Sequence, residues 1–307
     1  MLWWRRADGE LVRDLPNLRR IMPYIMRKRN ESAVYFEQTL DVGNAERFVR
    51  AFNEAHPETR ATLFHVVIWA SRQGLAEFPN LNRFVAGGRH YQRYGIWISY
   101  SAKQRMQKGA PLIVLKREFD PAESFQAMVA ALQSELQSAK FSGEVNAVDN
   151  ELKLLLALPG SLRRLIFAFY PVLEALGLFP RSFIEHDPLY ATLFLTDMGS
   201  LGMDAAYHHL YEYGTIGTFG ALGRAHVEHV AEPNTGRVER RRAAVMRWTF
   251  DERVEDGLYA GYGLKHVKRL IEDPVRGGIA AGDDATLARL GDAGAEGAGR
   301  PANADPA

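Results

Sequence analysis

The chain has 307 residues, of which 47% are hydrophobic and 24% are charged, values typical of a soluble globular protein. They exclude a disordered chain, a collagen-like repeat and a coiled coil. Its 38 basic and 37 acidic side chains leave a formal charge of +1, so we expect no nucleic-acid partner. The absence of cysteine excludes disulfides, thiolate metal sites and a cysteine nucleophile.

The two ends of the sequence bound the expected domain. The first residues lack an apolar core long enough for a signal peptide, which favours a cytoplasmic location. Residues 276–307 consist largely of Ala, Gly, Asp and Pro, and we expect a disordered tail because so few apolar groups cannot offset the entropy of ordering it. Residues 1–275 are expected to form one domain.

Helix signals recur along this domain. Asn44 is expected to cap a short helix through Phe52, and Thr62 to cap a longer one. Apolar residues at helical spacing predict a further helix that Asp120 opens and that ends near Lys140. The final helix is predicted over 258–272.

Strand signals lie between these helices. Short β-branched or aromatic runs predict strands over 96–100, 111–115, 189–195, 215–222, 227–230 and 243–250. Residues 233–236, Pro-Asn-Thr-Gly, predict a hairpin turn between the last two of them. A mixed α/β fold with antiparallel hairpins follows.

Segment 151–179 is very apolar, but prolines, glycines and charged residues interrupt it, so no part reaches the ~20 residues that a membrane span needs. We expect a pair of short helices that pack on the body or at a subunit interface. In that case Leu165, Phe169 and Leu173, on one helical face, contact the body or a neighbouring subunit, and the protein stays soluble beside liposomes. The alternative is peripheral contact with a membrane surface or an acyl chain, with Arg163 and Arg164 against phosphate headgroups.

The sequence RWTFDERVEDG over 247–257 ends a predicted strand with an acidic turn and a glycine. It resembles the S-F-D-H-R-V-x-D-G motif in the catalytic domain of the acyltransferase component of 2-oxo acid dehydrogenase complexes, with Glu252 at the position of the catalytic histidine. Four further segments resemble that family in the same order, at 19–36, 78–82, 195–202 and 219–224.

This resemblance covers roughly residues 15–275. It implies an α/β fold of the chloramphenicol acetyltransferase type, a two-layer sandwich of a mixed sheet with helices on one side. The apolar segment has no counterpart in the typical domain, and we expect a stand-alone domain without a lipoyl domain. The resemblance also implies a homotrimer, with a larger cage as an extension.

The resemblance assigns roles to three residues. In the family, a histidine takes the proton of a coenzyme A or dihydrolipoamide thiol, and the thiolate attacks the acyl thioester. Thr196 falls on the hydroxyl that stabilises the oxyanion, Asp256 on the supporting carboxylate, and Glu252 on the base. Proton transfer from a thiol near pKa 8.5 to an unperturbed Glu costs about 6 kcal/mol, against about 2.7 kcal/mol for transfer to His. The acidic residues around Glu252 raise its pKa in principle, but they also disfavour a thiolate.

His208 and His209 offer a substitute base, oriented by Glu252 or Glu212. The alternative interpretation is a pair of polar interface residues.

Three other patterns bear on phosphate and metal binding. Glycines at 214, 217, 220 and 223 lack the helix that a phosphate-binding loop needs, and we expect close packing at a subunit interface. His226 and His229 fall on opposite faces of a strand, so no shared metal is expected. Arg237 and the run 240–242 form a basic hairpin limb, either solvated or bound to coenzyme A phosphates or an acidic partner.

The sequence therefore predicts a coenzyme A-linked acyltransferase-like protein with a substituted base, a small-molecule thioester as substrate and no metal. The alternative is a non-catalytic trimeric or cage-forming scaffold that binds coenzyme A. What lies beside Thr196 in the assembled oligomer distinguishes the two, because an imidazole within hydrogen-bond reach of an open channel favours the enzyme and carboxylates alone favour the scaffold.

Overall fold

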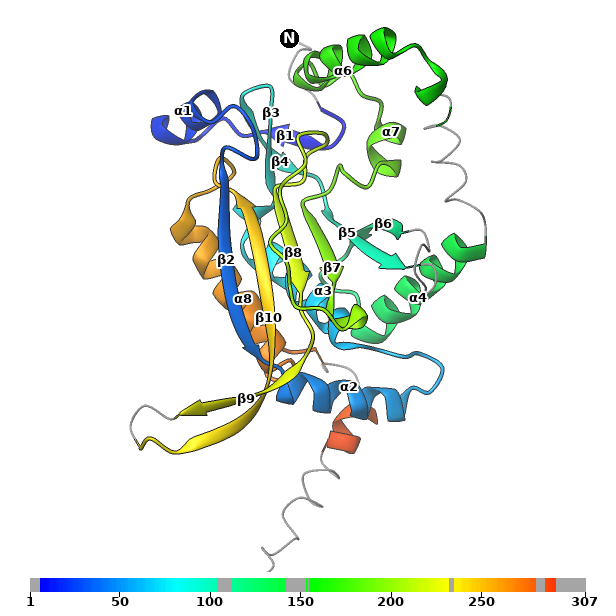
Figure 1. The fold of residues 1–307 in the computed structure, drawn as a ribbon, viewed down its shortest axis with the longest axis vertical. Coiled ribbons are helices and arrows are strands. Elements are labelled where there is room, and N and C mark those ends of the chain that lie inside the picture. Colours follow the sequence, from blue (N-terminus) through cyan, green and yellow to red (C-terminus); the bar gives the residue numbers. More distant parts are fainter. Residues whose placement is uncertain are drawn as a thin grey trace, which may run out of the picture.

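A mixed seven-stranded sheet forms the centre of the molecule, with the strand order β2-β10-β8-β7-β5-β6 and β9 paired to β10 (Figure 1). The structure is a computed structural model that describes residues 6–103, 112–141, 153, 155–231, 235–279 and 285–290. β7 runs parallel to both β5 and β8, and the other pairs are antiparallel. The sheet strands are β2 (Ala33–Asp41), β5 (Ile96–Lys103), β6 (Leu112–Phe119), β7 (Leu193–Asp197), β8 (Thr218–Leu222), β9 (His226–Ala231) and β10 (Val238–Asp251).

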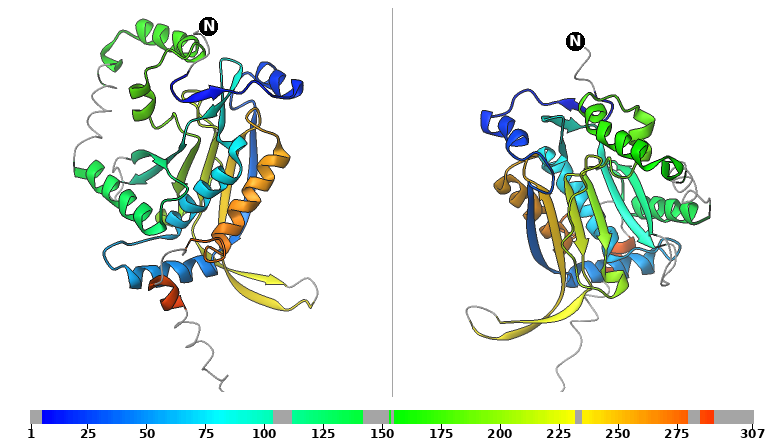
Figure 2. Two further views of the ribbon diagram at one scale, coloured as in Figure 1. Left: turned by 180° about the vertical axis from the view of Figure 1, so that it is seen from behind. Right: turned by 45° about the horizontal axis from the view of Figure 1, so that its top comes forward.

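Helices cover one face of this sheet, and the view from behind in Figure 2 shows them in front of the strands. The covering helices are α2 (Gly43–Ala55), α3 (Leu63–Glu77), α4 (Phe125–Phe141) and α8 (Gly257–Glu272). Leu193, Leu195 and Trp248 face them in the main hydrophobic core. Phe194 and Phe219 point to the opposite face, which we call the open face, where Leu210 and Ile216 of the connection before β8 cover them. The expected two-layer α/β sandwich is confirmed.

A smaller sheet and three helices lie at one end of the molecule (Figure 1). The small antiparallel sheet, absent from the sequence prediction, has the order β1-β4-β3. Its strands are β1 (Gly9–Leu11), β3 (Arg83–Ala86) and β4 (Arg89–Arg93), and the 3-10 helix Pro79–Asn82 precedes β3. The helices are α1 (Asn17–Ile25), α6 (Gly160–Ala175) and α7 (Arg181–His186).

Local hydrogen bonds show where three of the helices begin. Thr62 caps α3 as expected, through a capping box with His65. Asn44 does not cap α2, because Val42 is its N-cap and Asp41 accepts the hydrogen bond from Gly43 N at 3.1 Å. Asp120 starts a turn, accepting from Ala122 N at 2.9 Å, and the helix begins only at Phe125. The expectations for Asn44 and Asp120 are therefore wrong.

Two residues of the segment expected to form the tail, Ile279 and Leu290, pack with the main core. Residues 274–279 form turns, and Ile279 is a buried member of the main core. Leu290, in the short helix 285–290, packs against that core. The rest of the expected tail, 280–284 and 291–307, lies outside the described residues.

The apolar segment breaks where the sequence predicts. Residues 155–157 are helical, the chain turns at 158–159, and α6 follows. However, Leu165, Phe169 and Leu173 do not pack on the body of their own chain, because they are 53%, 56% and 40% exposed. That half of the packing expectation is wrong. Within the described residues, no helix is long and apolar enough to cross a membrane.

Candidate active site

The turn between β10 and α8 carries the family-like motif, and its last acidic residue holds the helix. Asp256 is the N-cap of α8, and its carboxylate accepts a hydrogen bond from Tyr259 N at 2.8 Å. Its second oxygen lies 3.8 Å from Arg19 Nη2. A negative group at a helix N-terminus is stabilised by the unpaired N–H groups there, so Asp256 acts here as a structural cap.

Arginines neutralise two more acidic residues of this turn, Asp251 and Glu255. Asp251 and Arg253, both buried, form an ion pair at 2.7 Å, and Ser32 Oγ donates to Asp251 at 2.8 Å. Glu255 lies 3.4 Å from Arg83 and 3.8 Å from Arg19. The acidic run is therefore a set of ion pairs rather than a cluster of bare charges.

Glu252 is held by its backbone alone. Its N–H donates to Ser32 O at 2.9 Å, and its carbonyl accepts from Arg19 Nη1 at 2.7 Å. Within the described part of the chain, its partly exposed carboxylate has neither a hydrogen-bond nor an ion-pair partner. The fold fixes the position at which the family has its base and leaves the side chain available.

Thr196 lies near the end of β7 on the open face, two residues beyond Phe194. The parallel register places it opposite Ser101 of β5, and Ser101 Oγ donates a hydrogen bond to Thr196 Oγ1 at 2.8 Å. Because Thr196 accepts this bond, its own hydroxyl proton is left to donate to a bound group.

One chain does not bring Thr196 and Glu252 together. The strand register aligns Thr196 with Ala221, and Ala221 with Arg247, which is five residues before Glu252. The two positions are therefore separated by about 17 Å along the strands and about 10 Å across them, or roughly 20 Å in total. A site that uses both residues needs a second copy of the chain.

His208 lies on the open face, over Phe219 of β8. Its ring stacks on Phe219, with centroids 3.9 Å apart and planes 8° apart, and Thr249 Oγ1 donates to its carbonyl at 2.6 Å. Phe219 is opposite Phe194 in the sheet, and Thr196 is two residues further along β7, a step of about 7 Å. The structure therefore places Thr196 and His208 on the same face of the sheet, about two residues apart along the strands.

Hydrogen bonding sets the tautomer of His208. Its Nδ1 lies 2.6 Å from His209 O, and because a carbonyl only accepts, Nδ1 carries the proton. The lone pair is then on Nε2, which has no partner among the described residues. Burial lowers the pKa of His208, with the nearby His209 as a smaller cause, so the ring is neutral near pH 7.

Neither expected carboxylate orients this pair. Glu212 accepts instead from Arg29 N and Asn30 N, both at 3.1 Å, and the carboxylate of Glu252 bonds to neither ring among the described residues. The ring of the exposed His209 stacks on His208 with centroids 4.5 Å apart. The expectation of a carboxylate partner is wrong, and the His209 carbonyl takes that place.

Three residues of this region were missed in the sequence. Ser101 supports Thr196, Arg19 anchors the backbone of Glu252, and buried His90 contacts Arg253 O through Nε2 at 2.7 Å. Arg19 lies in a segment that resembles the family, but no local pattern shows which strands are neighbours. The pairing of β5 with β7 is needed to find Ser101.

The glycine-rich strand packs inside the chain. A Cβ at Gly220 would lie 2.6 Å from Trp248 Cζ3 and 2.8 Å from Leu195 Cδ2. A Cβ at Gly214 or Gly223 would also lie under 3 Å from backbone of the same chain, and Gly217 is buried in ordinary contact with Val254. Their close packing is internal, contrary to the subunit interface expected from the sequence.

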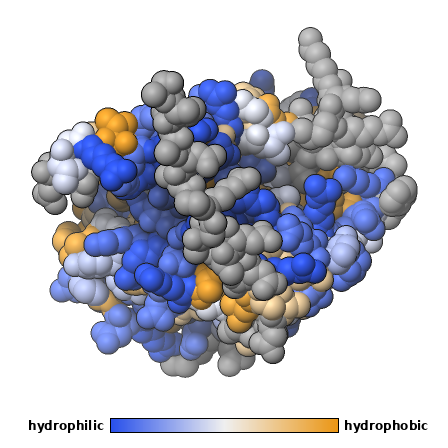
Figure 3. Space-filling model, turned by 90° about the horizontal axis from the view of Figure 1, so that it is seen from below, coloured by the Kyte–Doolittle hydropathy of each residue, from blue (hydrophilic) through white to orange (hydrophobic). Residues whose placement is uncertain are grey.

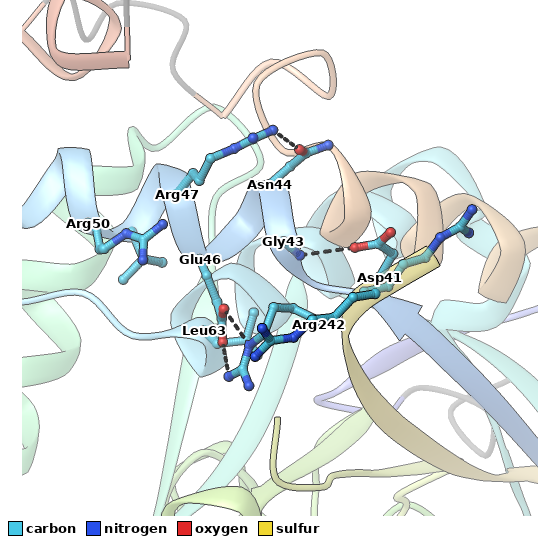
Figure 4. A pocket seen from close by; sticks show the side chains of 11 residues that line it. Asp41, Gly43, Asn44, Glu46, Arg47, Arg50, Leu63 and Arg242 are labelled. Atoms are coloured by element: carbon cyan, nitrogen blue, oxygen red, sulfur yellow. Dashed lines mark hydrogen bonds and ion pairs between the residues drawn. The ribbon is translucent and has the colours of Figure 1, made fainter. Parts of the chain in front are cut away.

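An arginine-lined cleft of about 820 Å³ opens between α2 and the base of the β9–β10 hairpin (Figure 4). Arg242 pairs with Glu46 at 2.7 and 2.9 Å, and Arg47 donates to Asn44. The cleft is on the helix side of the sheet and about 33 Å of strand away from Glu252, so within one chain it is separate from the Thr196 neighbourhood. No group of three metal-binding side chains occurs among the described residues.

A scan of protein-family models and a search of curated proteins find no match to this sequence. Solved structures do match. A dihydrolipoamide acetyltransferase from Azotobacter vinelandii, studied for the roles of a serine, a histidine and an asparagine in its catalytic mechanism, is 15% identical with a TM-score of 0.57. The cubic core of the pyruvate dehydrogenase multienzyme complex is also 15% identical, with a TM-score of 0.56. Each match covers 86% of this chain and 93% of the other.

A chloramphenicol acetyltransferase matches with 11% identity and a TM-score of 0.51, over 86% of this chain and 99% of its own. These three structures have the fold that the sequence motifs indicate. The chain therefore has the chloramphenicol acetyltransferase-like fold of the 2-oxo acid dehydrogenase acyltransferase cores.

Proposed function

We propose that this chain transfers acyl groups from a coenzyme A thioester to an acceptor, with His208 rather than Glu252 as the general base. The observation that carries the proposal is a neutral imidazole, with Nε2 open, on the same sheet face as the Thr196 hydroxyl. The fold and the acetyltransferase activity of two of its structural neighbours support acyl transfer.

The residues present suit each step of such a transfer. Nε2 of His208 accepts the proton of the attacking nucleophile, which adds to the acyl carbonyl. Thr196 Oγ1 donates to the resulting oxyanion while Ser101 Oγ donates to Thr196. The thiolate of coenzyme A then leaves and takes the proton from the imidazolium. For a thiol nucleophile, the transfer to an unperturbed His costs about 2.7 kcal/mol, and each pKa unit by which burial lowers His208 adds about 1.4 kcal/mol.

Coenzyme A as the acyl carrier rests on the likeness in fold. Arg242 is on the helix side of the sheet and Thr196 on the open face, so the arginine cleft does not serve this site within one chain. Calorimetric titration of the protein with coenzyme A tests this carrier.

The assembly that we propose is a homotrimer in which Thr196 and His208 of one copy face the β10–α8 turn of the next. The separation of roughly 20 Å between Thr196 and Glu252 within a chain supports a site formed between copies. A cage of trimers is a further step, because one of the structural neighbours is described as a cubic core.

A non-catalytic scaffold that binds coenzyme A is the second candidate. Glu252 favours it, because a carboxylate stands where the resembled family has its base and the buried charges around it are paired within the chain.

Release of the coenzyme A thiol from short acyl-coenzyme A donors, followed with a thiol reagent, separates the two candidates. His208→Asn is expected to lower kcat/KM by about 10²- to 10⁴-fold, the usual contribution of a general base. Thr196→Val is expected to lower kcat and leave KM nearly unchanged. The matched controls His209→Asn and Glu252→Gln are expected to stay within a few-fold of the parent.

The scaffold is supported instead if the parent protein releases no thiol while calorimetry detects coenzyme A binding. The enzyme proposal fails in its choice of base if His209→Asn costs as much as His208→Asn with the fold of both variants intact by circular dichroism.

A further inference from the structure

Helix α6 presents its apolar side chains outward. Along its 16 residues, the large apolar side chains are each between 40% and 56% exposed: Leu162, Leu165, Ile166, Phe167, Phe169, Val172 and Leu173. A surface helix of a monomeric protein normally buries its apolar stripe. Here the stripe faces solvent, and Leu176 and Leu178 continue it beyond the helix.

Polar residues of α6 face the body instead. Tyr170 Oη accepts a hydrogen bond from Gly214 N at 2.7 Å and lies 3.0 Å from Tyr190 Oη. Glu174 is 7% exposed, and Arg6 donates to its carbonyl at 2.6 Å and lies 4.0 Å from its carboxylate. These contacts fix how the helix is rotated, so the outward position of the apolar face is specified by the chain itself.

The charges that remain outside on α6 are all positive. Its one acidic residue, Glu174, is buried, whereas Arg164 is exposed and Arg163 partly so. Neither arginine has an ion-pair partner among the described residues. An outer apolar face, with two arginines near the start of the same helix whose long side chains extend toward the surface, is complementary to anionic headgroups above an apolar layer.

A second apolar and basic element lies at the same end of the molecule. Helix α1 exposes Leu18, Tyr24 and Ile25 at 71%, 60% and 65%, and the exposed Arg20 and Arg27 flank them. Figures 1 and 2 place α1 and α6 at this end in all views. The opposite end, viewed in Figure 3, shows mainly hydrophilic side chains where described residues are visible.

We infer that α6 binds an anionic lipid surface, with its axis along the membrane plane and Arg163 and Arg164 among the headgroups. At 16 residues the helix is about 24 Å long, which suits a helix lying in the interface and is too short to span the bilayer. A second copy of the chain is the less suitable occupant, because an arginine buried there without an acidic partner costs desolvation free energy. The inference does not depend on the proposed acyl transfer.

Vesicle flotation tests this inference on the full chain. We expect binding to vesicles of phosphatidylcholine with 30% phosphatidylserine, little binding to phosphatidylcholine alone, and loss of binding in high salt. Arg163→Glu with Arg164→Glu should weaken binding about tenfold or more. Arg240→Glu with Arg241→Glu makes the same charge change at the opposite end and should leave it nearly unchanged.

A second pair of variants separates lipid from a second copy. Leu165→Ser with Phe169→Ser should abolish flotation without changing the mass measured by light scattering. A loss of oligomer mass in that variant would show a subunit interface and overturn the inference. It is equally overturned if the parent protein fails to float with anionic vesicles, or if the control pair of arginines weakens binding as much as the α6 pair.

Discussion

At position 252, the backbone arrangement is independent of the side chain. The N–H and carbonyl of Glu252 are both hydrogen-bonded, and the acidic residues on either side have arginine partners. A change of side chain there therefore alters the chemistry of the turn at little cost to the fold.

Glu252→His is the residue-scale test of that argument. It lowers the cost of taking a thiol proton by about two pKa units, roughly 3 kcal/mol, relative to Glu. We expect faster thiol release from acyl-coenzyme A than in the parent, and in the His208→Asn background a partial recovery of activity. Thiol-release assays measure both. Unchanged rates with coenzyme A binding intact would mean that the missing histidine is not the main departure from the resembled family.

The pH profile of the proposed activity follows from the state of His208. A general base works when deprotonated, and burial lowers the pKa of this ring below its ordinary 6.5. We therefore expect kcat/KM to stay constant as the pH falls from 8 through 6.5 and to decline only below that value. A decline centred above pH 7 would indicate another group as the base. The profile of His209→Asn should match that of the parent.

Local signals in the sequence predict most elements, and the errors have physical causes. Thr62 and the hairpin glycine Gly236, with φ of +68°, act through short-range geometry and were predicted correctly. The small sheet was missed because its strands pair Gly9–Leu11 with residues some eighty positions away. The outward face of α6 was mispredicted because Glu174 and Tyr170 meet partners that are distant in sequence.

The capping box of α3 gives an element-scale prediction. Thr62 N donates to His65 Nδ1 at 3.0 Å, a bond that requires a neutral ring, and burial lowers the pKa of His65 to about 4. The unfolded chain binds a proton near pH 6.5 and the folded chain does not, so stability is complete above pH 6.5 and is lost as the pH falls toward 4. We expect the free energy of unfolding to fall by roughly 1–3 kcal/mol, a range reduced because the ring is partly exposed.

Urea unfolding at several pH values measures this loss. His65→Gln keeps the acceptor without the titration and should flatten this dependence.

The packing of β8 against β10 gives a second element-scale prediction. Gly220→Ala places a methyl group 2.6 to 2.8 Å from Trp248, Leu195 and Met246. Such overpacking typically costs 1–3 kcal/mol, so we expect the free energy of unfolding to fall by about that amount. Gly261→Ala in α8, with no atom within 4 Å of the new Cβ, is the control and should stabilise by about 0.5–1 kcal/mol. Equal effects of the two substitutions would contradict the packing argument.

In the whole molecule, Thr196 on the open face is too far from the β10–α8 turn of its own chain to share a site with it. A second copy must therefore supply that turn. Thr196 is roughly 20 Å from Glu252, and His208 lies between their levels because its carbonyl accepts from Thr249, three residues before Glu252. The sequence motifs identify both parts of the site, the Thr196 segment and the β10–α8 turn, because each part is a continuous stretch of sequence. The motifs do not show that the two parts are far apart, because the distance depends on the register of β7, β8 and β10.

A site made from two copies of the chain requires the protein to assemble. If the site combines two copies, the protein is a trimer or a multiple of three chains of 34.5 kDa, and light scattering at micromolar concentration should show that mass. Dilution shifts the equilibrium toward single chains by mass action, so activity per chain should fall in parallel with the trimer fraction. A monomer at micromolar concentration would overturn the assembly. Full activity per chain in dilute monomers would place the whole site within one copy, in which case Thr196 and His208 act without the β10–α8 turn.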